Sequence, residues 1–238
     1  MEYKNLTVIG TSHIARESIN EIKSFIEENQ PEIVALELDR SRFQTLVSKK
    51  RGNNLLSAMS FGLNGFLFMV LGQWAQRVLG KMVGVKPGSE MLTAIKLAKK
   101  HRLKIALIDQ DIRITLSRFS KALTLKEKFR ILWDIITGAI LRQNELKKLG
   151  IPSLDLTKVP DEEVIGKMMV VVRERYPNIY RVLVEERNVF MARNLAGLIE
   201  LNPDKRILAV VGAGHEKEIL ELVRLYTNGA GVSFVVDS

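Results

Sequence analysis

The sequence predicts an α/β protein in which a mainly parallel central sheet is flanked by helices. Two observations predict this class. Continuous apolar runs rich in β-branched residues lie at 6–9, 33–38, 105–108, 207–211 and 232–236. Runs without polar alternation are typical of strands that are buried on both faces of a sheet. Helix-like stretches separate most of these runs, and strands that alternate with helices form parallel sheets.

The elements follow one another along the chain as this class requires. After the first strand, a helix-like stretch runs from about Ala15 to Asn29 and ends before Pro31. Right-handed crossovers then place the first and second strands side by side or nearly so. A further helix begins near Glu90, and a later helical stretch is broken at Pro177.

Length and composition predict one domain. The chain has 238 residues, of which 46% are hydrophobic, enough for one sizeable core. We expect a single α/β domain over 1–238, with a helical insertion at about 52–88 and a helical region at about 124–200. Thr124 and Glu127, three residues apart, fit a capping box at the start of that region.

Charge and residue usage exclude several classes of function. The net charge is +9, but basic and acidic residues are interspersed and aromatic residues make up only 6%, so we expect no nucleic-acid partner. The chain has no cysteine, which rules out disulfides and thiolate zinc sites. It begins with a strand-like run and not with a charged-then-apolar leader, so we expect a cytoplasmic location.

One long segment, 52–76, carries no charge. Its length approaches that of a membrane span, but glycine, asparagine and glutamine interrupt it. A helix covered by protein, a helical lid, a dimer surface or a membrane-surface contact fits better than a span. The segment therefore leaves open a homodimer and a peripheral membrane contact through 55–71.

A short sequence motif occurs twice, each time directly after an expected apolar strand. Gly10 to His13 and Gly212 to His215 share the pattern Gly-x-x-His, and the chain has only three histidines. A glycine at a strand exit lets the backbone turn sharply. Because chemistry in an open α/β sheet gathers outside the carboxyl ends of the strands, the two histidines predict one site assembled from both ends of the chain.

Carboxylates end or follow the strands that are expected at 33–38 and 105–108. Glu37 and Asp39 end the second strand, and Asp109 and Asp111 follow the third. An unpaired carboxylate is costly to bury. An acid at the end of an apolar strand is therefore expected to have a hydrogen-bonding partner or a functional role. Helix capping is the alternative for Asp109 and Asp111, whereas glutamate is a poor N-cap, which favours a functional role for Glu37.

Two histidines and a carboxylate suit either of two mechanisms. In one, His13, His215 and Glu37 hold a divalent metal that polarises a carbonyl and lowers the pKa of a bound water to about 7. In the other, a histidine or Glu37 is a general base toward water without a metal, and the remaining imidazole or an arginine stabilises the oxyanion. Backbone amides at Gly212 and Gly214, at a predicted helix start, offer a further oxyanion site.

Several blocks of sequence resemble the TraB/PrgY family, in the family's order and over nearly the whole chain. These blocks are 10–13, 35–39 with Arg42, 107–111 with Thr115 and Arg118, 185–188 with Met191 and Ala192, and 210–215. The family includes the pheromone-shutdown proteins and is similar to the Tiki peptidases and to the erythromycin-esterase/ChaN-like superfamily. The resemblance implies the α/β fold of that superfamily with a helical lid or insertion.

The resemblance also implies roles for individual residues. The resemblance makes His13 and His215 the catalytic or metal positions and Glu37 and Glu186 the acidic part of the site. It also implies a catalytic role for Arg187, which is expected to orient carboxylates or substrate. Read alone, by contrast, the charges at 173–175 and 185–187 indicate a surface salt-bridge network. The residues expected to orient substrate or to stabilise an oxyanion are Arg42, Asp109, Arg118, Gly212 and Gly214.

Tiki-like members imply metal-dependent peptide cleavage with Mn²⁺ or Co²⁺, and Zn²⁺ also fits, whereas esterase-like relatives work without metal. We therefore expect a metal-dependent hydrolase that cleaves peptides. Metal-free ester hydrolysis and a non-enzymatic, peptide- or ligand-binding regulator at a membrane surface are the alternatives. The chain departs from the family at Asn188, where many members have aspartate, and at Gln110, which replaces an often basic residue.

Overall fold

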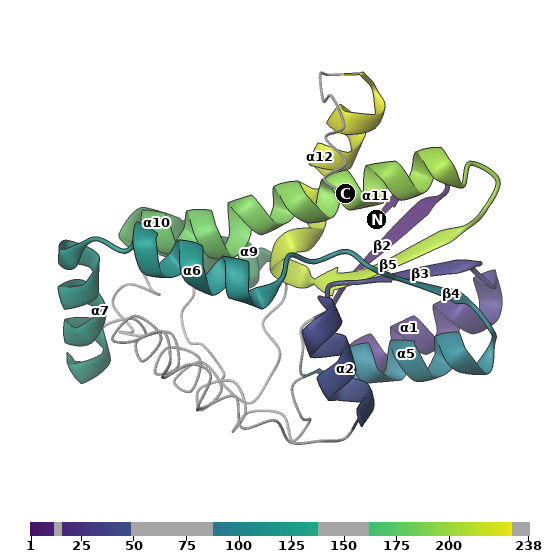
Figure 1. The fold of residues 1–238 in the computed structure, drawn as a ribbon, viewed down its shortest axis with the longest axis horizontal. Coiled ribbons are helices and arrows are strands. Elements are labelled where there is room, and N and C mark those ends of the chain that lie inside the picture. The colour runs from purple at the N-terminus through teal and green to yellow at the C-terminus, as the bar shows by residue number, and fades with distance from the viewer. Residues whose placement is uncertain (12–15, 49–87, 138–161, 230–238) are drawn as a thin grey trace. The chain divides into compact units, whose positions relative to one another are not determined.

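A computed structural model describes residues 1–11, 16–48, 88–137 and 162–229 (Figure 1). The chain divides into two compact units. The first comprises Met1–Lys49, Gly88–Asp111 and Glu186–Ser238, and the second comprises Lys50–Pro87 and Ile112–Glu185. The chain therefore leaves the first unit twice and returns to it twice. The insertion expected at about 52–88, the membrane contact expected at 55–71 and the strand expected at 232–236 lie outside the described residues.

The first unit contains a five-stranded sheet in the order β1-β2-β5-β3-β4 (Figure 1). Its strands are β1 (Glu2–Tyr3), β2 (Leu6–Thr11), β3 (Ile33–Leu36), β4 (Lys104–Leu107) and β5 (Ile207–Gly212). All pairings are parallel except that of β1 with β2. The predicted α/β class with a mainly parallel sheet is thus confirmed. β5 lies between β2 and β3, so these two strands are not direct neighbours.

Helices cover both faces of this sheet, as Figure 1 shows. α11 (Glu186–Leu201) and α12 (Ala213–Thr227) pack on one face, where Val8 and Ala209 contribute to the core. α1 (Arg16–Asn29) and α5 (Ser89–Lys100) pack on the other, where Ile9 and Val210 contribute. Successive residues of a strand point to opposite faces. Because both faces are covered, every residue of β3 and β5 is buried, which explains their unbroken apolar runs.

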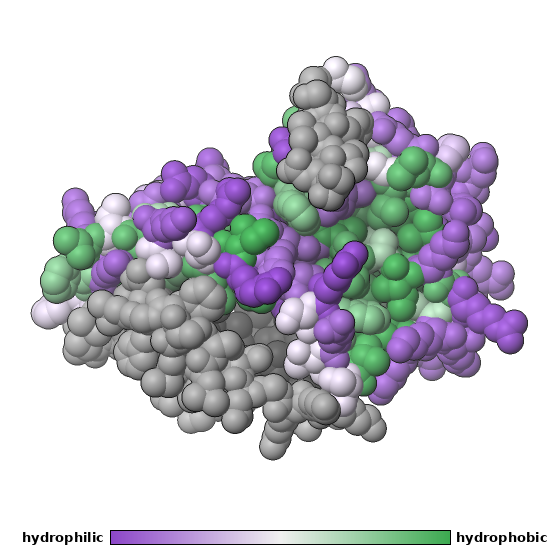
Figure 2. Space-filling model, viewed as in Figure 1, coloured by the Kyte–Doolittle hydropathy of each residue, from purple (hydrophilic) through white to green (hydrophobic). Residues whose placement is uncertain are grey.

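β4 is an edge strand of the sheet. Residues 105–107 are only partly buried. Figure 2 shows apolar residues along this side of the first unit, bordered by hydrophilic ones. The remaining helix of the unit, α2 (Arg40–Ser48), follows β3 after three residues and carries one side chain of the candidate site.

The described part of the second unit is helical. It comprises α6 (Ile112–Ala122), α7 (Leu125–Thr137), α9 (Glu162–Arg175), α10 (Pro177–Tyr180) and the π-helical turn η2 (Arg181–Glu185). Thr124 Oγ1 accepts from the Glu127 N–H at 3.2 Å, and Glu127 Oε2 accepts from the Thr124 N–H at 3.1 Å. This confirms the predicted capping box. Pro177 is the first residue of α10 and marks the predicted break.

Buried polar contacts hold α7 within the second unit. Asp134 accepts hydrogen bonds from Arg175 Nε at 2.7 Å and from the Tyr176 hydroxyl, and Glu127 Oε1 accepts from the Asn178 N–H at 3.1 Å. Burial alone raises the pKa of Asp134, but the hydrogen bonds outweigh burial and lower that pKa below its ordinary value. Asp134 is therefore a buried, ionised acid with a fixed partner.

Across the ranges that the structure describes, no helix is both long enough and apolar enough to cross a bilayer.

Candidate functional site

Polar side chains meet at the carboxyl edge of β3, β4 and β5. Glu37 follows β3, Asp109 follows β4, and His215 lies in the first turn of α12, directly after β5. All three side chains are buried. This is the edge of the sheet at which the sequence places the site.

Arg187, in the first turn of α11, joins two of these side chains. Its Nη2 donates to Glu37 Oε1 and, at 2.6 Å, to Asp109 Oδ2, and its Nε donates to Asp109 Oδ1 at 3.1 Å. The pair with Asp109 is therefore bidentate, the strongest geometry for arginine and a carboxylate. Burial lowers the pKa of Arg187, but Glu37 and Asp109 more than compensate and raise it above its ordinary value. Arg187 is a fixed cation.

A second arginine closes the group. Arg42 on α2 donates through Nη2 to Asp109 and through Nε to Asp39 Oδ2 at 2.6 Å. Asp39 Oδ1 also accepts from the Arg42 N–H at 3.0 Å, so Asp39 caps α2 while it holds the guanidinium. Glu37, Asp39, Arg42, Asp109 and Arg187 are called the arginine–carboxylate cluster below.

The second oxygen of Glu37 fixes the end of β5. The Gly212 N–H donates to Glu37 Oε2 at 2.6 Å. Glu37 thus links the ends of two neighbouring strands and holds Arg187 at the same time. An oxyanion at the Gly212 N–H, as the sequence leads us to expect, has to compete with this carboxylate.

His215 has a defined proton arrangement. Asn188 Nδ2 donates to Glu218 Oε2 at 2.6 Å, because a carboxylate only accepts. Asn188 Oδ1 therefore faces His215 Nδ1, at 2.5 Å, and this contact requires a proton on Nδ1. In the neutral ring, Nε2 then carries the lone pair.

The Nε2 atom of His215 faces the arginine–carboxylate cluster. It lies 3.4 Å from Arg187 Nη1 and 3.7 Å from Glu37 Oε1. Since a guanidinium only donates, Nε2 is the acceptor in the first contact. A basic nitrogen, a fixed cation and a carboxylate oxygen therefore converge on one point.

Gly10, at the end of β2, lies against α12. A Cβ atom at this position would lie 2.1 Å from Glu216 Oε2 and 3.1 Å from the Cα of Ala213, so only glycine fits without a shift. In the register of β2 on β5, Thr11 pairs with Gly212. The backbones that lead into the two Gly-x-x-His histidines therefore run side by side. The side chain of His13 lies outside the described residues.

Three other expected residues are not members of the cluster. Glu186 is half-buried and precedes Arg187 on α11, so its side chain leaves the helix about 100° around the axis from that of Arg187. Arg118 is exposed on α6, in the other unit. Gly214 lies in the first turn of α12.

Two residues of the site have a role that sequence reasoning missed. The sequence assigns no role to Asn188, which departs from the family, yet this residue links His215 to Glu218. Glu218 lies three residues after His215 on α12, and this spacing places the two on one side of the helix. That spacing is the signal that points to Glu218 from sequence alone.

The described residues do not by themselves fit a metal ion. Among them, no group of three histidine, aspartate or glutamate side chains is arranged to hold one. Glu37 and Asp109 both bind guanidinium groups, and the fixed charge of Arg187 disfavours a second cation beside it. A metal site at this edge therefore depends on His13.

Fold and site together define an α/β protein with a buried histidine and an arginine–carboxylate cluster at the carboxyl edge of a parallel sheet. The chain belongs to the TraB/PrgY/gumN family, whose model matches residues 2–227.

Relatives with this similarity occur in archaea and in mammals. An uncharacterized protein of Methanocaldococcus jannaschii is 36% identical over 235 residues, which are 97% of this chain and 56% of the relative. The TraB domain-containing protein of Bos taurus is 27% identical over 87% of this chain and 59% of its own length. The TraB domain-containing protein of Homo sapiens is 26% identical over 87% of this chain and 60% of its own length. The chain thus spans little more than half the length of these relatives.

Proposed function

We propose that this protein is a hydrolase that cleaves a peptide or ester bond with a water molecule activated by His215. The observation that carries this proposal is the proton arrangement of His215. Its Nδ1 proton is held by Asn188, so the lone pair of Nε2 faces Arg187 and Glu37. A neutral imidazole fixed in one tautomer is the group that general-base catalysis requires.

The first half of the reaction follows from these positions. A water takes the place of Arg187 Nη1 at the lone pair of His215 Nε2 and attacks the substrate carbonyl carbon, and its proton moves to Nε2. The ring is then an imidazolium that faces Glu37 Oε1 at 3.7 Å, and the carboxylate compensates the new charge.

Arg187 supplies the electrostatic part of catalysis. Its Nη1 lies beside Nε2, so it is placed to stabilise the negative charge that develops on the carbonyl oxygen. Glu37 and Asp109 hold the guanidinium before substrate arrives, which avoids reorganisation during the reaction. As the tetrahedral intermediate collapses, Nε2 returns its proton to the leaving amine or alkoxide.

The proposal is tested by peptide and ester cleavage with single-histidine variants. His215→Ala removes the base and is expected to abolish cleavage. His101→Ala is the matched control, because His101 is exposed at the end of α5. Equal activity of the two variants would refute the proposal, and calorimetry that shows peptide binding without turnover would favour a non-enzymatic regulator.

A metal-dependent peptidase is the second candidate. It is favoured by the 3.7 Å separation of His215 Nε2 from Glu37 Oε1 and by the register that brings the backbone before His13 alongside β5. Mn²⁺ or Co²⁺ is the expected ion, and Zn²⁺ also fits an imidazole and carboxylate set. Metal analysis and a chelator decide between the two: activity that is lost with a chelator and restored by Mn²⁺, and absent in His13→Ala, establishes the metal. Activity that survives the chelator assigns the reaction to the protein groups alone.

A further inference from the structure

The second unit presents an exposed apolar stripe on α7. Leu125, Phe129 and Trp133 are spaced by four residues, so they lie along one side of the helix. Their exposed fractions are 72%, 71% and 67%. The opposite side of the helix packs into the unit through Glu127 and Ile131, which are buried.

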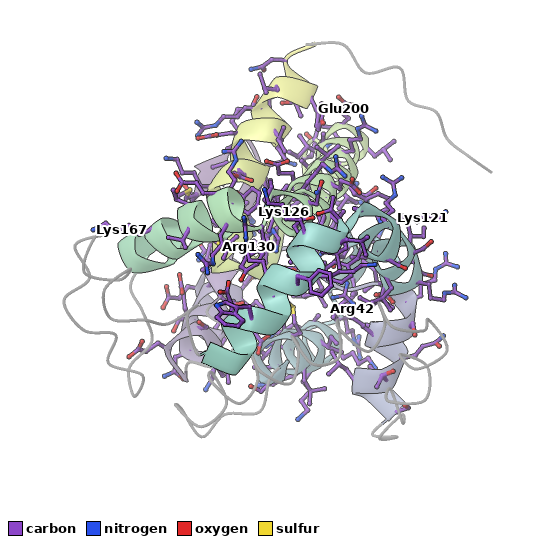
Figure 3. All side chains as sticks on the ribbon, turned by 90° about the vertical axis from the view of Figure 1, so that its left-hand side faces the viewer. Arg42, Lys121, Lys126, Arg130, Lys167 and Glu200 are labelled. Carbon is purple, nitrogen blue, oxygen red and sulfur yellow. The ribbon has the colours of Figure 1, made fainter. Side chains whose placement is uncertain are left out.

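The charge on the accessible part of α7 has one sign. The two acids of the helix, Glu127 and Asp134, are both buried and hydrogen-bonded within the unit. Lys126 is exposed, and Lys128 and Arg130 are half-buried. Figure 3 shows Lys126 and Arg130 on this helix. The outward face of α7 is therefore apolar and basic.

The basic side chains flank the stripe on both sides. With about 100° per residue, Lys126 and Arg130 fall on one border and Lys128 on the other. Lys121, exposed at the end of α6, adds a further positive charge just before α7. Bulky apolar residues bordered by lysine and arginine are typical of a helix that lies in the interface of a bilayer, and tryptophan prefers that depth. Lysine is depleted in protein–protein interfaces, which argues against a protein as the occupant.

We propose that the outward face of α7, formed by Leu125, Lys126, Phe129 and Trp133, binds the surface of an anionic lipid bilayer. The apolar side chains insert below the headgroups while the lysines remain at the level of the lipid phosphates. One helix face of this size gives reversible attachment and not a permanent anchor. The residues of this surface differ from those of the segment 55–71, for which the sequence predicts a membrane contact.

Flotation with lipid vesicles tests the binding. The full chain is expected to float with vesicles of equal parts phosphatidylglycerol and phosphatidylcholine, and to remain behind with phosphatidylcholine alone. Phe129→Ser should weaken partitioning about tenfold, since a buried phenylalanine contributes at least that much. Lys126→Gln should weaken it about fivefold. The matched controls are Leu201→Ser and Lys99→Gln, exposed residues of the first unit that should leave partitioning unchanged.

Fluorescence places the contact on α7 directly. The chain has two tryptophans, so Trp74→Phe leaves Trp133 as the single tryptophan reporter. Lipids brominated on the acyl chain should quench Trp133 in the bound protein. No recovery on anionic vesicles, equal recovery of Phe129→Ser and Leu201→Ser, or bound protein with an unquenched Trp133 would each overturn the proposal. The quenching arm does not depend on how well Phe129→Ser folds.

Discussion

Asn188 Oδ1 and His215 Nδ1 are joined by a hydrogen bond of 2.5 Å between the first turns of α11 and α12. The other end of the Asn188 amide donates to Glu218. An amide at position 188 therefore directs the proton of the neutral ring to Nδ1 without placing a negative charge against it. An aspartate at this position would stabilise an imidazolium instead.

Asn188→Asp should move the activity to higher pH. A carboxylate against Nδ1 favours the doubly protonated ring, and a general base must be neutral, so more alkaline conditions are needed to free Nε2. The pH dependence of kcat/KM and the ¹⁵N chemical shifts of the ring measure the two effects. Asn29→Asp, at an exposed position on α1, is the control. An unchanged pH profile would show that Asn188 does not position His215 for catalysis.

Arg187→Met should destabilise the first unit by about 3 kcal/mol or more, because the substitution leaves Glu37 buried without its guanidinium. Urea unfolding measures the loss. Arg206→Met removes an exposed arginine that pairs with Glu32 at 3.9 Å and should cost at most about 1 kcal/mol. In Arg187→Met with Glu37→Gln, the combined loss should be smaller than the sum of the single losses. Additive losses would mean that the two side chains are not coupled.

The second unit should lose stability in acid through Asp134. Its pKa lies below the ordinary value of 3.8, so its contribution to folding is present above that value and is lost as the pH falls through the lower folded-state pKa. Asp134→Asn should therefore be less stable than the natural chain at neutral pH, and this difference should shrink in acid. Trp133 fluorescence in a Trp74→Phe background reports the unfolding of α7. Glu28→Gln, at an exposed position on α1, is the control and should show no such difference.

Gly10→Ala should destabilise the protein by about 1–3 kcal/mol, since its Cβ meets both the Glu216 carboxylate and the backbone of α12. Gly197→Ala is the matched control on α11. No atom lies within 4 Å of a Cβ added there, so the better helix former should stabilise the chain by about 1 kcal/mol. Thermal unfolding compares them. Glu216→Ala should restore part of the loss in Gly10→Ala, whereas no restoration would place the whole clash on the backbone of Ala213.

The strands of the sheet were predictable because burial on both faces leaves an unbroken apolar run. The expected run at 207–211 corresponds to β5, Ile207–Gly212, and that at 105–108 to β4, Lys104–Leu107. β1 was missed because its two residues are too few to show a period. The position of β5 in the centre was also missed, since strand order depends on how the helices pack and not on any local pattern.

The site was less predictable than the fold. Local charge patterning predicts a surface salt bridge at Arg173 and Glu185, and the structure agrees. Their side chains are exposed, and Arg173 Nη2 lies 3.5 Å from Glu185 Oε1. Two residues further along, Arg187 is instead a half-buried member of the cluster, and its partners Glu37 and Asp109 follow β3 and β4. Contacts between residues so far apart in sequence leave no periodic signal. The family resemblance, and not the local charge pattern, indicated that Arg187 belongs to the site.

The order of synthesis determines when the central strand, β5, can join the sheet. Of the described strands, the one in the middle of the sheet is also the one that leaves the ribosome last. Until it arrives, β2 and β3 lack the neighbour that both require, and Glu37 lacks the amide of Gly212. A nascent chain therefore has to keep its earlier strands from aggregating until β5 has been synthesised, and the site around His215 is assembled only after that.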